Sequence, residues 1–303
     1  MSRAATKAVR AGRRTVRVSR PEKVLFPDDG ITKGDLAEYY RAVAQRALPH
    51  LRGRPLMLER HPDGVTGGSF MQKDVPEYFP DWIGRAELPK EGGTVTHVLC
   101  DDTSTLVYLA GQGVLTLHRW LSRADRPDHP DRLVFDLDPH GDDFGEVRFA
   151  ARQLHDLLDE LGLPSTVMTT GSRGLHVIVP LDRKAPFDDV RAFARASADV
   201  LAARHPDRLT TAPRKEAREG RLYLDIQRNA YAQTAVAPYS VRALPGAPVA
   251  APLAWDEVDD PGLDARRWTL ATVTDRLDQD PWHDAPGRGR SLAPARRRLD
   301  ALS

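Results

Sequence analysis

Two aspartates, Asp136 and Asp138, stand two residues apart in the stretch RLVFDLDP, which runs from residue 132 to residue 139. Side chains alternate between the two faces of a β-strand, so this stretch as a strand puts both carboxylates on one face and only apolar residues on the other. The Cα atoms of the pair would lie about 6.6 Å apart. That spacing suits two divalent cations held about 3.5–4 Å apart, as in two-metal phosphoryl transfer. A plain strand followed by an Asp-rich turn is the alternative, because Asp-x-Asp alone is a weak signal.

Two later stretches have the same construction. Residues 175–179 place His176 opposite an apolar face, and residues 220–229 place Asp225 and Gln227 opposite another. Three aspartates without a cysteine or histidine cluster favour Mg²⁺ or Mn²⁺ over zinc. The pattern therefore predicts metal-dependent chemistry on a phosphate ester.

The Gly-rich turn before residue 175 holds candidate phosphate contacts. Its glycines, Gly171 and Gly174, allow backbone N–H groups to approach an anion, and Ser172 and Arg173 add a hydroxyl and a cation. A hydroxyl-rich loop further along the chain ends in Arg242, a second cation suited to a triphosphate. A simple hairpin is the alternative for the turn, because Gly-x-x-Gly is common.

Other candidates stand singly. Lys23 and Lys33 flank a turn, which ordinary solvated lysines also do. Phe70, on a Gly-flanked loop beside Lys73, is suited to stacking on a base and equally to anchoring a core. His118 falls near the end of a short predicted strand, where histidines are more often structural.

Periodicity predicts the elements that carry these residues. Helices are expected over 32–48, with a capping box formed by Thr32 and Asp35, over 144–161 and over 188–204. Strands are expected over 94–99, 105–110, 113–120 and 166–170, and residues 255–277 are expected to be helical in part.

Charge and composition bound the organisation of the chain. The net charge is +1, but residues 1–20 carry seven Lys or Arg and no acid, so the remainder carries −6 (+1 minus 7). We expect a flexible basic arm over 1–19, either an unselected leader or an arm that adds affinity for nucleic acid. A catalytic domain over 20–280 (an N-terminal part 20–130, the catalytic sheet 131–245 and a docking segment 250–280) and a loose tail over 281–303 complete the prediction. One cysteine, no apolar run of membrane-spanning length and no signal sequence predict a cytoplasmic protein with no membrane partner.

Five motifs occur together and in order: KVLFP from Lys23, GITKGDL from Gly30, LVFDLDP from Leu133, GSRGLHV from Gly171 and QTAVAPYSVR from Gln233. In this combination the chain resembles, over about residues 19–280, the polymerase domain of the bacterial ligase D type, a branch of the archaeo-eukaryotic primase superfamily. The resemblance implies an α/β (α+β) fold, with an RRM-like mixed or antiparallel catalytic sheet flanked by helices. It also implies template-dependent addition of nucleotides, typically ribonucleotides, to primer 3′ ends at gaps or double-strand breaks during non-homologous end joining.

The resemblance also implies roles for individual residues. The metal-binding and catalytic triad would be Asp136, Asp138 and Asp225. The nucleotide contacts would be Ser172, Arg173, His176, His118, Gln227 and Arg242. The DNA contacts would be Lys23 and Lys33, at the 5′-phosphate of a downstream strand, with Phe70 and Lys73 at the template. Two positions depart from the family pattern: Met71 stands where a second aromatic is usual, and Arg173 stands where lysine is frequent.

Cofactors and partners follow from the same resemblance. We expect two Mn²⁺ or Mg²⁺ ions, no zinc, and NTP or dNTP substrates. The expected partners are DNA with 5′-phosphorylated gaps or ends, the Ku protein and an ATP-dependent DNA ligase in trans, because these 303 residues hold no ligase or nuclease segment. The protein is then a stand-alone polymerase of the cytoplasm and nucleoid, suited to extension more than to de novo priming. A metal-dependent nuclease and a catalytically silent DNA-end-binding adaptor are the alternatives from other classes.

Overall fold

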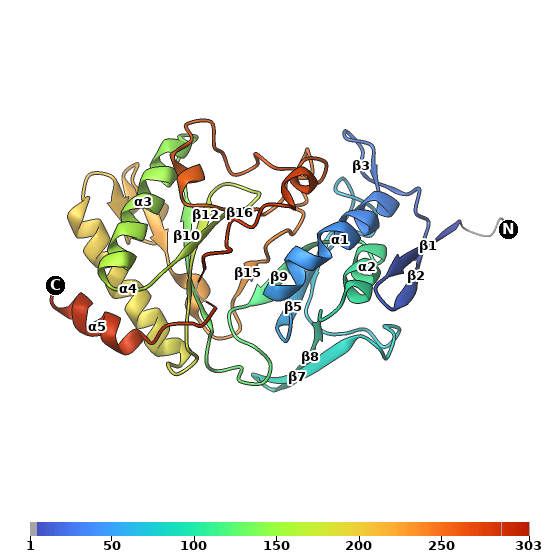
Figure 1. The fold of residues 1–303 in the computed structure, drawn as a ribbon, viewed down its shortest axis with the longest axis horizontal. Helices are drawn as coiled ribbons and strands as arrows, with labels where there is room; N and C mark the ends of the chain where they lie inside the picture. Colours follow the sequence, from blue (N-terminus) through green and yellow to red (C-terminus); the bar gives the residue numbers. More distant parts are fainter. Residues whose placement is uncertain (1–4, 286, 303) are drawn as a thin grey trace. The chain divides into compact units, whose positions relative to one another are not determined.

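The computed structural model describes residues 5–285 and 287–302, and it divides the chain into two compact units (Figure 1). Unit 1 comprises Met1–Trp120, Val236–Ala250 and Trp268–Gln279; unit 2 comprises Leu121–Ala235, Ala251–Arg267 and Asp280–Ser303. The division differs from the predicted order of parts: the first boundary is at residue 120, and the segment predicted to dock at 250–280 alternates between the units. The fold is mixed α/β, with antiparallel sheets flanked by helices, as the sequence predicted.

Unit 2 contains a sheet in the order β13-β14-β10-β12-β11-β16. Its strands are β10 (Arg132–Asp138), β11 (Thr166–Thr169), β12 (Leu175–Pro180), β13 (Leu209–Thr210), β14 (Leu222–Asp225) and β16 (Pro252–Leu253). All neighbours are antiparallel except β13 and β14. Helices α3 (Phe144–Glu160) and α4 (Phe187–Arg204) pack against this sheet and against each other (Figure 1). Because both helices bury apolar side chains on one face of the sheet, the polar side chains of β10, β12 and β14 collect on the other.

Unit 1 contains a second sheet, in the order β9-β5-β8-β7, with β6 paired to β5. Its strands are β5 (Pro55–Arg60), β6 (Phe70–Gln72), β7 (Gly84–Lys90), β8 (Gly93–Leu99) and β9 (Val114–Trp120). The helices are α1 (Lys33–Ala47), followed by the short η1 (Leu48–His50), and α2 (Thr103–Gly111). The chain returns to this unit through β15 (Thr234–Val236). The predicted capping box is confirmed: the Thr32 side chain accepts from the Asp35 N–H, and the Asp35 carboxylate accepts from the Thr32 N–H.

The expected flexible arm is wrong over residues 6–19. These residues form the hairpin of β1 (Thr6–Ala11) and β2 (Arg14–Ser19), joined in six antiparallel pairs. Val9, Val16 and Val18 are buried against the helices of unit 1, and the Ser104 hydroxyl of α2 donates to the Ala11 carbonyl at 2.8 Å. Apolar residues do alternate with other residues over this stretch, as in a strand, but the arginines between the valines made it resemble a flexible basic segment. Residues 1–4 of the predicted arm lie outside the described part.

Two further expectations are corrected. The stretch 105–110 is part of helix α2, not a strand, because Asp102 caps it by accepting from the Thr105 N–H at 2.8 Å, and every residue of the stretch except Tyr108 is buried. The predicted loose tail contains α5 (Leu292–Asp300), whose Leu292, Ala295 and Leu299 are buried where it packs on α4. Residues 286 and 303 of that tail lie outside the described residues. Residues 255–277, which were predicted to be helical in part, contain two short 3₁₀-helical turns, η4 (Asp256–Asp259) and η5 (Val273–Arg276).

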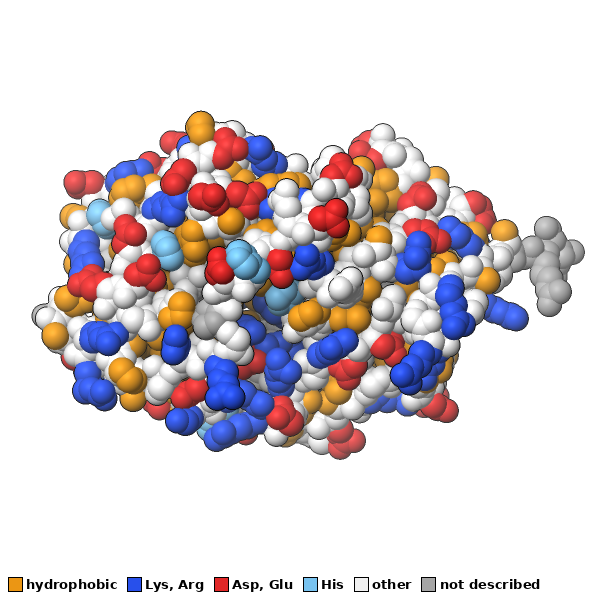
Figure 2. All heavy atoms as spheres, viewed as in Figure 1, with side chains coloured by type: hydrophobic (Ala, Val, Ile, Leu, Met, Phe, Trp, Pro, Cys, Tyr) orange, Lys and Arg blue, Asp and Glu red, His pale blue; other side chains and the backbone are white. Residues whose placement is uncertain are grey.

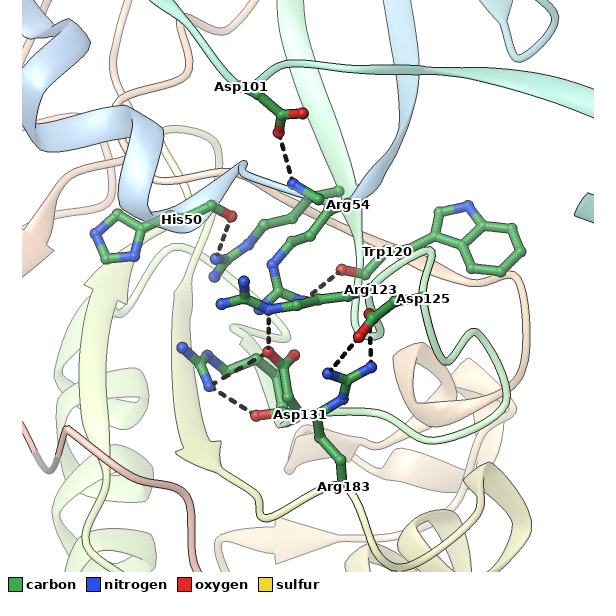
Figure 3. Close-up of polar contacts among 11 residues, drawn as sticks. His50, Arg54, Asp101, Trp120, Arg123, Asp125, Asp131 and Arg183 are labelled. Atoms are coloured by element: carbon green, nitrogen blue, oxygen red, sulfur yellow. Dashed lines mark hydrogen bonds and ion pairs between the residues drawn. The ribbon is translucent and has the colours of Figure 1, made fainter. Parts of the chain in front are cut away.

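Arginines are tied to acidic groups and carbonyls within each unit (Figure 3). In unit 1 the buried Arg54 donates to the Trp120 carbonyl at 3.3 Å, and the buried Arg119 donates to the His50 carbonyl at 3.0 Å. In unit 2 Arg183 makes a two-pronged pair with Asp125, at 2.7 and 3.0 Å, and Arg123 pairs with Asp131 at 3.1 Å. Buried guanidinium groups need such partners because an unpaired buried charge is costly. None of the described helices is long and apolar enough to cross a membrane.

Candidate active site

The carboxylates predicted from the alternation in β10 meet a third from β14. Antiparallel register places Asp136 directly opposite Asp225 on one side and opposite His176 of β12 on the other. Directly opposed residues of antiparallel strands share a face, with Cβ atoms about 4.5–5.5 Å apart. Asp138, two residues further along β10, lies opposite Tyr223. The three aspartates and His176 therefore occupy one patch on the polar face of the sheet.

Asp136 is buried and both of its carboxylate oxygens are engaged. Oδ1 lies 3.3 Å from Nε2 of His176, and Oδ2 accepts from Nε of Arg228 at 3.1 Å. Burial alone would raise the pKa of Asp136, but the neighbouring His176 and Arg228 outweigh it and lower that pKa to about 2. Asp136 is therefore a carboxylate at neutral pH.

Asp138 and Asp225 are shifted in the opposite direction. Partial burial and the charge of Asp136 raise the pKa of Asp138. Burial likewise raises the pKa of Asp225, although its Oδ1 accepts from the Gln227 N–H at 2.7 Å. Several carboxylates crowded on one face repel one another, and a bound cation would relieve that repulsion.

The turn from Thr170 to Gly174 closes one end of this patch. A side chain at Gly174 would put its Cβ 1.9 Å from the Leu137 carbonyl oxygen and 2.7 Å from Oδ1 of Asp138, so only glycine allows the turn to lie against the end of β10. The Arg173 guanidinium donates to the Pro139 carbonyl at 3.0 Å. The turn thus places the cation of Arg173 beside Asp138, and the contact of the Ser172 hydroxyl with a phosphate stays a prediction.

The prediction that backbone N–H groups of this turn approach an anion is corrected by the structure. The N–H groups of Ser172, Arg173 and Gly174 all point at the Thr170 hydroxyl oxygen, at 3.2–3.3 Å. These three N–H groups already donate to the Thr170 hydroxyl oxygen. The turn therefore offers an anion its side chains and not these three N–H groups. Thr170 was not among the residues selected from the sequence.

A pocket of about 190 Å³ opens beside Asp138 and Asp225. Cationic and aromatic side chains complete its wall, and the Arg218 guanidinium lies 4.4 Å from the centre of the Tyr223 ring. The lining residues are Asp138, Pro139, His140, Arg173, Lys215, Arg218, Tyr223 and Asp225. Two carboxylates facing three cations across a pocket suit a phosphate ester that carries a divalent cation.

Gln227 does not lie on the strand where the sequence alternation predicted it. Strand β14 ends at Asp225, and Gln227 to Asn229 form the short turn η3 (Gln227–Asn229), so Gln227 does not continue the alternation. Its side-chain oxygen accepts from Arg191 of α4, which engages it away from the carboxylates. The turn follows from the hydrogen bond between the Asp225 carboxylate and the Gln227 N–H, a common local motif of aspartate.

Two residues of η3 were not selected from the sequence. Arg228 neutralises Asp136, as described above. Asn229 is fully buried and pairs with the edge of β10 as a strand would: its Oδ1 accepts from the Val134 N–H at 2.9 Å, and its Nδ2 donates to the Val134 carbonyl at 2.7 Å. Nδ2 also donates to the Ile226 carbonyl at 2.9 Å. Asn229 is the chain's only asparagine, which was the one available signal.

The patch fits a hard divalent cation in donor type and in strand position. Within residues 5–285 and 287–302, however, no three carboxylate, imidazole or thiolate side chains are arranged as a metal-ligand cluster. The reason is local: Asp136 faces His176 and Arg228, while Asp225 faces the N–H of Gln227. The arginine supplies positive charge at the place where a metal ion would supply it.

The predicted 5′-phosphate contacts lie together in unit 1. The Lys33 N–H donates to the Lys23 carbonyl at 2.8 Å, so the hairpin of β3 (Val24–Phe26) and β4 (Ile31–Thr32) brings the two lysines side by side. Lys23 makes an ion pair with Asp63 at 2.5 Å. Lys33 is buried, and burial together with the nearby charges of Arg20 and Lys23 lowers its pKa. Three clustered cations outnumber the two nearby carboxylates, Asp63 and Glu22, which suits a bound anion.

The remaining predicted residues are also in unit 1. Phe70 is 47% exposed on β6 with the Arg60 guanidinium 5.3 Å from its ring centre, and Met71 is equally exposed. Lys73 follows β6 and is exposed, and Arg242 is half-buried. An exposed aromatic favours the stacking interpretation of Phe70 over the core interpretation.

His118 lies on β9 beside a carboxylate that was not predicted from the sequence. Its Nε2 is 3.4 Å from Glu59 of β5, and the other oxygen of Glu59 is 3.1 Å from Nε2 of His61. Hydrogen bonding from His118, working against burial, lowers the pKa of Glu59 to about 2. Glu59 therefore orients the His118 ring.

The comparisons with known proteins all indicate the same family. A family model described as "LigD, primase-polymerase domain" matches residues 32–282. The multifunctional non-homologous end joining protein LigD of Mycolicibacterium smegmatis is 35% identical over 87% of this chain and 35% of its own length. Its counterpart in Pseudomonas aeruginosa is 34% identical over 98% of this chain and 36% of its own length. The chain thus spans about a third of these relatives.

A solved structure is similar over nearly its whole length. The polymerase domain of Mycobacterium tuberculosis ligase D in complex with DNA superposes with a TM-score of 0.83 at 34% identity, over 88% of this chain and 95% of that one.

Proposed function

This chain belongs to the LigD primase-polymerase domain family, a family of nucleotidyltransferases, and from that premise we propose that it extends primer 3′ ends on a DNA template at gaps or breaks. The observation that carries the proposal is the register of Asp136 with Asp225, with Asp138 on the same face of an antiparallel sheet. This is a carboxylate patch on a rigid scaffold, beside a pocket with a cationic wall.

In this proposal Asp136, Asp138 and Asp225 hold two divalent cations, Mg²⁺ or Mn²⁺. When bound, such ions lower the pKa of a primer 3′-hydroxyl and offset the charge of a pyrophosphate leaving group. His176 orients Asp136 through the 3.3 Å contact, and the buried position of Asp136 keeps that contact dry. Ser172 and Arg173 on the turn contact phosphate oxygens of the incoming nucleotide. The nucleotide-contact roles of His118 and Arg242 remain predictions.

DNA binding is proposed through unit 1. Lys23 and Lys33, with Arg20 nearby, would bind the 5′-phosphate of a downstream strand, and the buried, cation-crowded Lys33 is the strongest support for that role. Phe70, exposed and backed by Arg60, would stack on a template base, with Lys73 beside it. The relative solved with DNA supports a DNA ligand for this chain.

The relatives' names support a place in non-homologous end joining. We extend that role to this chain, with ribonucleotides as the preferred substrates and with Ku and an ATP-dependent ligase as partners. The preference for ribonucleotides and the pairing with Ku rest on the family resemblance.

The test is primer extension on a gapped duplex with a downstream 5′-phosphate, in Mn²⁺, with either ribo- or deoxynucleoside triphosphates. Wild type is compared with Asp136→Asn, which keeps the side-chain volume and removes the charge. Templated extension that falls at least about a thousandfold in the variant, with DNA affinity unchanged within about threefold, supports the proposal. Shortened primer indicates a nuclease, and binding without any change in primer length indicates a DNA-end adaptor.

A further inference from the structure

The N-terminal hairpin β1–β2 is basic and firmly anchored. Residues 5–20 hold six cations and no acid. The inward side chains Val9, Ala11, Val16 and Val18 are at most 4% exposed, and both strands pack on α2. Such a hairpin presents its outward side chains in a defined arrangement, which a disordered basic arm cannot do.

Five of these six cations, all but Arg20, lie on the two strands and their turn and divide into two groups. Lys7 pairs with Glu38 of α1 at 2.9 Å, and Arg14 pairs with Asp102 at 3.4 Å and stacks over Trp82 at 5.0 Å. These two anchor the hairpin to its own unit. Arg10, Arg13 and Arg17 are exposed, and their side chains make no hydrogen bond or ion pair with any other residue that the structure describes. In Figure 2, Lys and Arg side chains gather at the place that Figure 1 gives to β1 and β2.

Strand geometry directs two of these arginines outward. Arg10 alternates with the buried Val9 and Ala11, and Arg17 alternates with the buried Val16 and Val18. Their neighbours on the outer face are small or hydroxylic: Ala8, Thr15 and Ser19. Without an outward aromatic or aliphatic anchor, this face offers little to a hydrophobic partner or to unstacked bases, and three guanidinium groups suit phosphates.

The open end of the hairpin leads directly to the lysine pair. The Arg20 N–H donates to the Ala5 carbonyl, and the Gly34 N–H donates to the Pro21 carbonyl, each at 2.8 Å. The hairpin base is therefore tied to the start of α1, where Lys33 lies beside Lys23. Six residues of strand extend about 20 Å, which equals the axial rise of about six base pairs at about 3.4 Å each.

We propose that the outer face of this hairpin, carrying Arg10, Arg13 and Arg17, binds backbone phosphates of the downstream DNA duplex, continuing from the 5′-phosphate held at Lys23 and Lys33. The inference rests on the proposed function, because it takes the lysine pair as the phosphate site. It adds a duplex-binding surface about six base pairs long that is independent of sequence.

The test compares wild type with the triple variant R10S/R13S/R17S, which alters only outward side chains. Affinity for gapped DNA is measured by fluorescence anisotropy between about 50 and 300 mM KCl, with the downstream duplex varied from about 2 to 14 base pairs. The matched control is R41S/R204S/R208S, which removes the same charge from surface arginines that already pair with Glu38, Glu160 and Glu146. Circular dichroism verifies that both variants remain folded.

We expect the slope of log K against log salt to become less steep by about 0.9 for each phosphate that the variant no longer neutralises, up to about 2.7 in the triple variant. Wild-type affinity should increase until the duplex reaches about six base pairs, whereas the triple variant should show no such increase. The control should keep the wild-type slope. A triple variant with the wild-type slope, or with equal losses of affinity on DNA that has no downstream duplex, overturns the proposal.

The failure of this inference is distinct from failure of the proposed function. The triple variant should still prefer a 5′-phosphate over a 5′-hydroxyl in DNA-binding competition, because Lys23 and Lys33 are intact. Absence of extension by wild type would refute the polymerase, whatever the salt slope.

Discussion

Asn229→Ala is the substitution whose cost can be worked out most directly from the structure. Strand β14 ends at Asp225, so it offers no ladder partner to Val134 two residues back along β10. The Asn229 amide replaces that partner with two hydrogen bonds to Val134 and one to the Ile226 carbonyl, all between 2.7 and 2.9 Å. Asn229 and Val134 both have no exposed surface.

The variant would leave the buried N–H and carbonyl of Val134 without partners, whereas the Ile226 carbonyl would still accept from the backbone N–H of residue 229, at 3.1 Å in the wild type. An unsatisfied buried donor or acceptor costs about 1–3 kcal/mol. Since water entering the vacated space would recover part of the cost of these two groups, we expect a loss of about 2–4 kcal/mol in the free energy of unfolding, a large share of a typical value of about 5–15 kcal/mol.

The assay is urea unfolding followed by circular dichroism, with the denaturant slope checked for two-state behaviour. The control is Gln153→Ala on α3, which also removes an amide side chain but one with no hydrogen bond among the described residues; it should change stability by less than about 0.5 kcal/mol. A loss below about 1 kcal/mol in Asn229→Ala would refute the view that this amide completes the edge of β10.

Three other predictions concern the charges of the two candidate sites. Because the folded-state pKa of Asp138 is raised, its contribution to stability is present at low pH and lost as pH rises, so Asp138→Asn should raise Tm at about pH 7.5 and raise it less at about pH 4; an equal gain at both pH values would contradict the shift. Arg228→Gln removes the cation from Asp136, so electron paramagnetic resonance should show Mn²⁺ binding about three- to tenfold more tightly, and weaker binding would show that Arg228 instead holds the carboxylate in place for the metal. Replacing Lys23 and Lys33 by serine should abolish the preference for a 5′-phosphate in DNA-binding competition while leaving extension on an open template largely intact, and an equal loss on phosphorylated and unphosphorylated DNA would exclude that role.

The local patterns of this chain were sufficient for much of the fold and for the main site. Strand β10 was predicted with its observed bounds because every second residue from Leu133 to Leu137 is apolar and Pro139, which cannot donate to a sheet ladder, follows directly. Helices α1 and α3 were predicted within a few residues because their stripes and caps, Thr32 and Asp35 among them, are local signals. The three aspartates could be placed on the polar faces of their strands for the same reason: alternation depends only on neighbouring residues.

The tertiary structure decided everything that depends on partners distant in sequence. Whether residues 6–19 fold depends on α2, which buries the valines of the hairpin, and the hydrogen bond between Ser104 and Ala11 spans 93 residues of chain. The stretch 105–110 is rich in β-branched and apolar residues and could have paired as a strand, but capping by Asp102 and burial of all its residues except Tyr108 favoured a helix. Gln227 left the strand because Asp225 formed a turn, and only then could Arg228 reach Asp136 and Asn229 reach Val134.

Sequence alone was thus enough to select candidate residues for the chemistry, since residue type and alternation are local properties. It did not determine which groups those residues meet. The pairing of Asp136 with Arg228, the capture of three N–H groups by Thr170 and the seating of the basic hairpin each arise from strand register and burial, and these depend on the free energy of the whole fold.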